Sequence, residues 1–235
     1  MLADFNVEII FCYYIQALSY SVIAERLTNE ILISSNPKLE LYQKAQDNLL
    51  EASRICHFLA NHAMLLTPFH CKKVNIIPEL NKNIMNGLSI LFYAEAQLVA
   101  EEKSNDKSLS ISFHTRAGIL MDTSMLFKQC LEFIEKGIGE LDKKVKEFMK
   151  SYYLDYIKGQ ILFCEGLAYY FSSKRYQEEN PNVEELPENK KKRLILEGKS
   201  FKFIKKFELE YKSKLYKNWK FFDTYVTPIL SKYEE

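Results

Sequence analysis

The sequence predicts an all-α protein. Among 235 residues there are only 7 Gly and 6 Pro, while 47% of residues are hydrophobic. Apolar side chains recur at helical spacing over long stretches, which indicates helices rather than strands. Few helix breakers and many Leu, Ile, Lys and Glu favour long helices over a sandwich or an α/β sheet. We therefore expect one helical domain over residues 1–235, large enough for a substantial core.

The first predicted helix covers Asp4 to Asn29, and Glu30 to Asn36 reads as a loop. We expect its buried face to follow helical spacing through Ile9, Tyr13, Ala17, Tyr20 and Ala24. Its apolar run from Val7 to Ala24 lacks a basic leader and contains Gln16 and three tyrosines. We interpret this run as a core helix rather than a signal peptide or membrane span.

The second predicted helix runs from Lys38 to Leu66, and Pro68 ends it. Its inner stripe is Leu41, Ala45, Leu49, Ala52, Cys56 and Leu59. The connection from Thr67 to Pro78 follows. Possible metal ligands in this connection and in the helix before it are Cys56, His57, His62, His70 and Cys71. Their spacing matches no finger or ribbon pattern, so we expect no metal and no cofactor.

The third predicted helix, Asn83 to Lys103, is apolar on nearly all sides and should be the central buried helix. Its main stripe is Ile84, Leu88, Leu91, Leu98 and Val99. Glu95 points into this stripe. A buried carboxylate needs a partner or water, so Glu95 either pairs with a Lys, Arg or Tyr or lines a cleft.

A short polar turn predicts that the third and fourth helices are antiparallel neighbours. The polar turn Ser104 to Lys107 leads into a fourth helix, Ser108 to Lys136, which Gly137 and Gly139 end. A fifth helix covers Glu140 to Gln177. Its stretch GLAYYFSSKRY has the small-then-aromatic spacing of tetratricopeptide-type hairpins, without a regular repeat elsewhere. The segment Glu178 to Glu188 reads as an acidic loop.

The C-terminal region, residues 188–235, is basic and helical by prediction, and Pro228 bends or ends its last helix. Between Glu188 and Lys220 there are twelve basic and four acidic residues, a local net charge of +8, although the whole chain carries only +1. The densest positions are Lys190, Lys191, Lys192 and Arg193. This region is either a solvated helix face or a surface for anionic lipid or an acidic partner. The overall balance implies no nucleic-acid partner.

No catalytic pattern is present. The sequence has no P-loop, nucleophile elbow, GxGxxG or HExxH motif. Five scattered cysteines, an odd number, indicate reduced and buried thiols in a cytosolic protein rather than a disulfide framework. We expect a helical scaffold that binds a partner, and not an enzyme.

Three stretches carry a resemblance to a known family. They are YYIQALSYSVIAERL (Tyr13 to Leu27), NLLEASRICHFLANHA (Asn48 to Ala63) and LSILFYAEAQLVAEEKSNDK (Leu88 to Lys107). In this order the chain resembles the BRO-type domain of Alix-like, ESCRT-associated adaptor proteins from about Phe11 to Phe207. The resemblance implies a banana-shaped, elongated domain with a tetratricopeptide-like antiparallel helix core. It also implies a cytoplasmic adaptor near endosomes, in ESCRT-linked vesicle transport.

The same resemblance implies a partner and a site. Family members bind the C-terminal amphipathic helix of an ESCRT-III subunit on an apolar patch. The matching positions here are Leu59, Ala100, Phe113 and Ala117. Ala100 replaces a usual Phe and Ala117 a large aliphatic residue, unless the turn differs by one residue and Arg116 falls there. The family's N-terminal strand segment has no counterpart in this sequence. The alternative function is a scaffold that binds anionic membrane through the basic C-terminal region.

Overall fold

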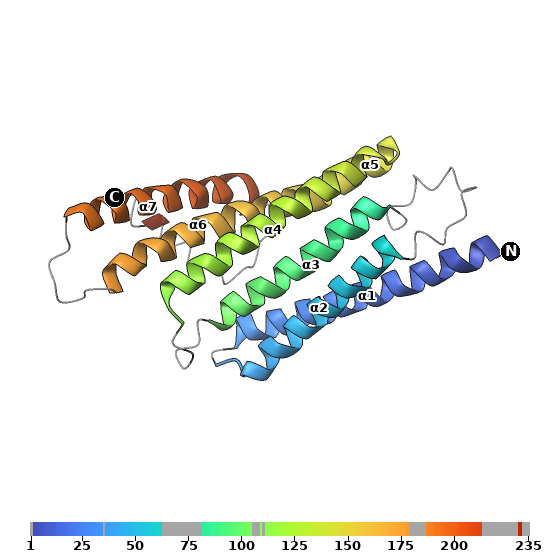
Figure 1. Ribbon diagram of the computed structural model, residues 1–235, viewed down its shortest axis with the longest axis horizontal. Coiled ribbons are helices and arrows are strands. Elements are labelled where there is room, and N and C mark those ends of the chain that lie inside the picture. Colours follow the sequence, from blue (N-terminus) through green and yellow to red (C-terminus); the bar gives the residue numbers. More distant parts are fainter. Residues whose placement is uncertain are drawn as a thin grey trace. The chain divides into compact units, whose positions relative to one another are not determined.

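The computed structural model describes residues 2–34, 36–62, 81–104, 109, 111–178, 187–212 and 230–231 (Figure 1). These residues form helices and, within the described ranges, no strand, so the all-α prediction is confirmed. The α-helices are α1 (Leu2–Ile33), α2 (Leu39–Asn61), α3 (Lys82–Lys103), α4 (Phe113–Gly139), α5 (Lys143–Met149), α6 (Asp155–Glu178) and α7 (Pro187–Phe207), and the π-helical segments are η5 (Lys150–Leu154) and η6 (Glu208–Lys212). Four predicted features lie wholly or mostly outside the described residues: the connection with His70 and Cys71, the polar turn before the fourth helix, the acidic loop and Pro228.

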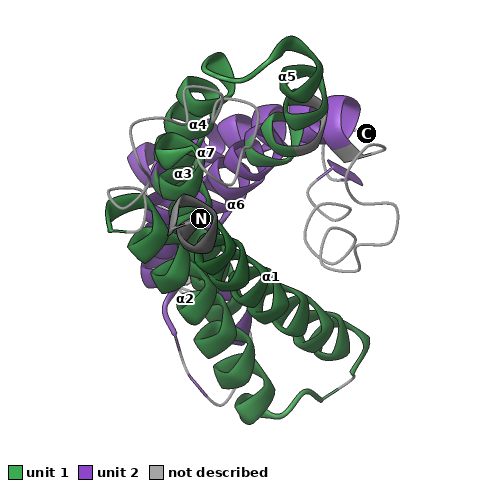
Figure 2. Cartoon of the chain, turned by 90° about the vertical axis from the view of Figure 1, so that its right-hand side faces the viewer, with its two compact units in different colours: residues 1–100, 126–157 green, residues 101–125, 158–235 purple. Residues whose placement is uncertain are grey.

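The described chain forms two compact units (Figure 2). Unit 1 comprises Met1–Ala100 and Leu126–Ile157, and unit 2 comprises Glu101–Met125 and Lys158–Glu235. Helices α3, α4 and α6 each contribute residues to both units. The single domain predicted from the sequence stays a prediction, as does its tetratricopeptide-like arrangement.

In unit 1, helix α1 packs along a single narrow stripe. Its buried residues are Ile10, Ala17, Ala24 and Ile31, each seven residues from the next. The predicted face was therefore wrong at two positions, since Ile9 and Tyr13 are exposed. The predicted loop at residues 30–36 was also too long, because Ile31 continues the stripe and extends the helix to Ile33.

Helices α2, α3 and the second part of α4 form an antiparallel layer in unit 1 (Figure 1). The Gln46 side chain donates to the Ala96 carbonyl at 3.3 Å, and the Ser53 hydroxyl donates to the Ser89 carbonyl at 2.8 Å. Gly87 faces the Ile134 side chain, where an added Cβ would lie 2.5 Å from its Cδ1. Small residues at this crossing let the two backbones approach closely.

Gly137 makes the reciprocal contact. It lies inside α4 rather than ending it, and an added Cβ would lie 2.6 Å from Ile84 Cγ1 and 3.0 Å from the Ile84 backbone nitrogen. Asn81 precedes α3 and accepts from the backbone N–H groups of Asn83 and Ile84 at 2.9 and 3.1 Å. Its amide donates to Glu140 at 2.8 Å. The start of α3 is thus fixed to the end of α4 by an N-cap and a glycine contact.

In unit 2, helices α6 and α7 pack antiparallel. Phe163 lies 5.6 Å from Phe207 between ring centroids, and the Ser200 hydroxyl donates to the Gly166 carbonyl at 2.8 Å. Gly166 is close to Ile204, where an added Cβ would lie 2.5 Å from Cδ1. Two large apolar side chains are exposed, Phe148 on α5 in unit 1 at 65% and Ile195 on α7 in unit 2 at 51%.

Candidate partner-binding surface

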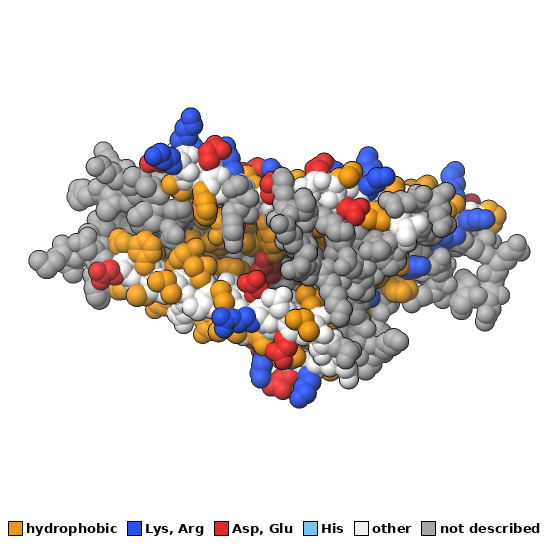
Figure 3. Space-filling model, turned by 180° about the vertical axis from the view of Figure 1, so that it is seen from behind, with side chains coloured by type: hydrophobic (Ala, Val, Ile, Leu, Met, Phe, Trp, Pro, Cys, Tyr) orange, Lys and Arg blue, Asp and Glu red, His pale blue; other side chains and the backbone are white. Residues whose placement is uncertain are grey.

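Exposed large apolar side chains concentrate on α1. Six of its residues are more than a third exposed: Ile9, Tyr13, Ile15, Val22, Ile23 and Ile33. Figure 3 shows hydrophobic side chains gathered along α1 with few charged groups between them. A helix usually buries three or four apolar residues in every two turns, whereas α1 buries one in every seven residues. Much of its apolar surface is therefore left uncovered.

Helix α1 is also long and apolar enough to cross a membrane, judged by length and composition, between Val7 and Ile33. Only 17% of an 18-residue apolar window within that stretch is buried inside the protein. The interpretation of α1 as a core helix therefore holds for its single buried stripe and not for its other sides.

An aromatic patch joins α1 to α2. We define it as Ile9, Tyr13, Phe58 and His62. The Tyr13 and Phe58 rings meet edge to face with centroids 5.6 Å apart, and Phe58 stacks on His62 at 5.4 Å. Tyr13 and Phe58 are 41% and 42% exposed. Aromatic residues are enriched at protein-binding surfaces, and these rings contact each other while remaining open to solvent.

The predicted partner-binding residues are divided between the two units. Leu59 and Ala100 belong to unit 1, and Phe113 and Ala117 belong to unit 2. Leu59 is 0% exposed and Ala117 is 6% exposed, so in this conformation neither offers surface to a partner. Ala100 and Phe113 are partly exposed. The binding roles of these four residues stay predictions.

The sequence pattern did not indicate Phe58, the residue next to Leu59. Leu59 belongs to the inner stripe of α2, of which all members except Leu41 are buried. Phe58 lies off that stripe and faces outward. A large aromatic side chain outside a well-defined buried stripe was the signal that could have identified it.

Around Phe113, unit 2 contains a buried ion pair. Phe113 stacks on Phe171 with centroids 5.8 Å apart, and the Arg116 guanidinium lies 3.9 Å above the Phe171 ring. Arg116 is buried and its Nε donates to Glu101 Oε1 at 2.9 Å. Burial raises the pKa of Glu101, although Arg116 acts in the opposite direction. Arg116, the alternative predicted contact, is thus held inside the protein.

Glu95 pairs with a tyrosine, one of the two alternatives left open by the sequence. The Tyr156 hydroxyl donates to Glu95 Oε1 at 2.7 Å. Burial raises the pKa of Glu95 to about 7, the Tyr156 hydrogen bond lowers it in part, and nearby Glu25 raises it further. The pair lies within unit 1.

The predicted basic surface is only partly exposed. Lys190, Lys191 and Lys192 are exposed on the first turns of α7. Arg193 instead forms an ion pair with Glu197, with its Nη1 atom 3.0 Å from Glu197 Oε1. Beyond these lysines, Leu194 and Ile195 are 52% and 51% exposed. The outward face of α7 therefore combines lysines with two uncovered aliphatic side chains.

Three of the described cysteines are buried, namely Cys56, Cys130 and Cys164, and burial raises the pKa of the Cys56 thiol to about 12. Cys12 is exposed, contrary to the prediction of buried thiols.

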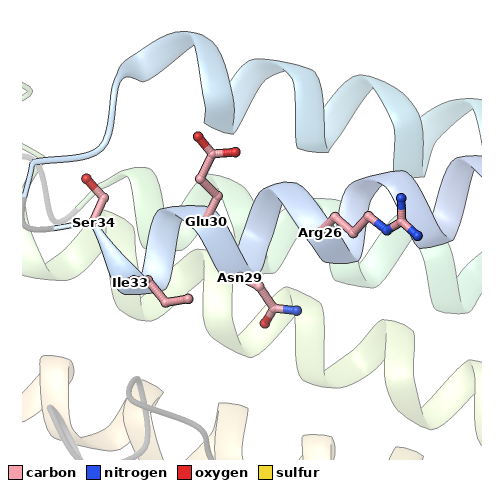
Figure 4. A pocket seen from close by; sticks show the side chains of 5 residues that line it. All are labelled: Arg26, Asn29, Glu30, Ile33 and Ser34. Carbon is pink, nitrogen blue, oxygen red and sulfur yellow. The ribbon is translucent and has the colours of Figure 1, made fainter.

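An open depression at the end of α1 is lined by Arg26, Asn29, Glu30, Ile33 and Ser34 (Figure 4). Their polar groups point in different directions rather than converging on one point.

No protein-family model matches the chain, and no curated protein matches it. The resemblance to BRO-type domains therefore stays a prediction, based on the sequence stretches that carry it.

Proposed function

We propose that this protein is a non-enzymatic adaptor that binds an amphipathic helix of a partner protein on the aromatic patch. The observation that carries the proposal is the Tyr13–Phe58 pair, two large aromatic side chains that touch each other and are each about 40% exposed. An apolar stripe of a partner helix could cover these rings together with Ile9, in a helix-in-groove mode.

The nature of the partner is proposed from the sequence resemblance. Alix-like adaptors bind the C-terminal helix of an ESCRT-III subunit, and we propose the same class of partner here, in endosomal sorting or membrane remodelling. Since Leu59 is buried and Phe58 beside it is exposed, Phe58 takes the anchoring role that the sequence assigned to Leu59. The partner helix then contacts a face of α2 about 100° around the helix from the predicted one, beside Tyr13 of α1.

The test is a titration of the full chain with C-terminal helix peptides from ESCRT-III subunits of the same organism. We expect saturable micromolar binding that Phe58→Ala weakens by about 2 kcal/mol, or roughly thirtyfold. Met125→Ala is the matched control, since Met125 is 62% exposed but lies in unit 2, and it should leave affinity unchanged. No binding at hundreds of micromolar, or equal losses in both variants, would rule the proposal out.

A second function is favoured by α7. Its exposed Lys190, Lys191 and Lys192 adjoin exposed Leu194 and Ile195, a combination suited to the surface of an anionic membrane. The expected result is binding to phosphatidylserine vesicles that falls steeply with salt and is lost when the three lysines are changed to Glu. Binding that survives these changes would exclude this function for α7.

A further inference from the structure

Helix α1 carries a second line of residues on the side away from its buried stripe. The members recur at alternating intervals of four and three residues, and every one is exposed. We call this line the outer seam: Glu8, Cys12, Ile15, Ser19, Val22, Arg26, Asn29 and Ile33. This spacing is the one by which two helices pack with knobs into holes.

The centre of the outer seam is uncharged, and its apolar side chains are exposed. Ile15 is 60% exposed and Val22 is 45% exposed. Between them, the Ser19 hydroxyl donates to the Ile15 carbonyl of its own helix at 2.8 Å. This hydroxyl therefore loses no hydrogen bond when an apolar side chain covers it.

Charged residues stand on both sides of this uncharged centre. Glu8 lies toward the N-terminal end of α1 and Arg26 toward its C-terminal end. Among the described residues, neither forms an ion pair. Their opposite signs distinguish one end of the seam from the other.

We propose that the outer seam is a homodimer interface in which the α1 helices of two copies pack antiparallel, with the twofold axis at the level of residue 17. In this register Glu8 faces Arg26 of the other copy, and the symmetric contact repeats at the opposite end. Cys12 faces Val22 and Ile15 faces Ser19, so each larger side chain meets a smaller one.

Charge complementarity favours this antiparallel register over other ways of pairing the two α1 helices. A parallel, in-register pair would place Glu8 against Glu8 and Arg26 against Arg26. An antiparallel pair shifted to the next register would place Glu8 against Ile33 and Arg26 against Ile15. Only the proposed register joins opposite charges at both ends while keeping the uncharged residues together.

The dimer is expected to be weak. The seam from Glu8 to Arg26 is about 27 Å long at 1.5 Å per residue. One helix pair of this length buries less surface than a standard interface, so we expect a micromolar dissociation constant.

Sedimentation velocity of the full chain over a concentration series tests the proposal. We expect a monomer–dimer equilibrium in which Glu8→Arg and Arg26→Glu each weaken the dimer about tenfold, because two attractive contacts become repulsive. The double variant Glu8→Arg/Arg26→Glu restores affinity to within about threefold, since the charges are exchanged. Asp47→Arg, an exposed change on α2, is the control and should have no effect.

A cross-link tests the register directly. Val22→Cys should give a dimer on non-reducing gels after oxidation with copper–phenanthroline, with a bond between residues 12 and 22 identified in chymotryptic peptides. Cys12→Ser/Val22→Cys should not. Three results would overturn the proposal: a monomer at all concentrations, a Cys12–Cys12 bond in the unsubstituted protein, or a monomer that binds neutral phosphatidylcholine vesicles in an Ile15-dependent way.

Discussion

Glu95 is a carboxyl group whose surroundings favour its protonated form. Burial is the main cause, and it raises the pKa to about 7 despite the hydrogen bond from Tyr156. The sequence placed Glu95 within an apolar stripe, where we expected a Lys, Arg or Tyr as a possible partner. It could not identify Tyr156, because the two residues are 61 positions apart and meet only after folding.

The raised pKa of Glu95 predicts a pH dependence of stability. Between about pH 4.5 and pH 7 this group is ionised in the unfolded chain but protonated in the folded one, so the free energy of unfolding falls as pH rises. The free energy of unfolding should fall by about 3 kcal/mol in total once the pH is above 7. Glu95→Gln resembles the protonated form, so this variant should not show the fall when its stability is measured by urea unfolding.

Exposed Glu132 provides the control, since Glu132→Gln should preserve the pH dependence of the unsubstituted protein. A constant stability difference between the protein and Glu95→Gln from pH 4.5 to pH 8 would show that Glu95 does not titrate as described.

The buried pair Glu101–Arg116 gives a second prediction. Arg116→Met should lower the free energy of unfolding by about 3–5 kcal/mol, because Glu101 is left as an uncompensated buried charge. Adding Glu101→Gln should recover part of the loss. Arg54→Met, which breaks an exposed pair with Glu51, should cost less than about 1 kcal/mol. Equal losses at Arg116 and Arg54 in thermal unfolding would contradict this account.

At the scale of the element, two helices differ in how well the sequence predicted them. In α2 the apolar residues form one distinct stripe, and nearly all of the predicted inner residues are buried. In α1 apolar residues occur on all sides, so periodicity could not identify the narrow stripe of Ile10, Ala17, Ala24 and Ile31. Which side of such a helix is covered depends on its neighbours.

The crossing of α3 and α4 yields a prediction about glycine. Gly137→Ala should lower the free energy of unfolding by about 1–3 kcal/mol, because the new methyl group would overlap the side chain and approach the backbone of Ile84. Gly118 lies in the same helix with nothing within 4 Å of an added Cβ. Gly118→Ala should therefore stabilise by up to about 1 kcal/mol. Stabilisation by both changes in chemical denaturation would show that the crossing is looser than described.

At the scale of the whole molecule, the sequence correctly predicted the all-α class. Low Gly and Pro content and long helical periodicity were enough for that. The candidate surface was harder to predict. Leu59 and Phe58 are adjacent in sequence, and a difference of one residue on a helix separates a buried side chain from an exposed one.

The central claim, that a partner helix binds on the aromatic patch, is tested most directly by hydrogen exchange of the full chain with and without a saturating ESCRT-III C-terminal peptide. We predict slower exchange in the α1 and α2 segments around Tyr13 and Phe58, with no change in α7. Slower exchange confined to α7, or none in α1 and α2 despite saturation, would contradict the claim.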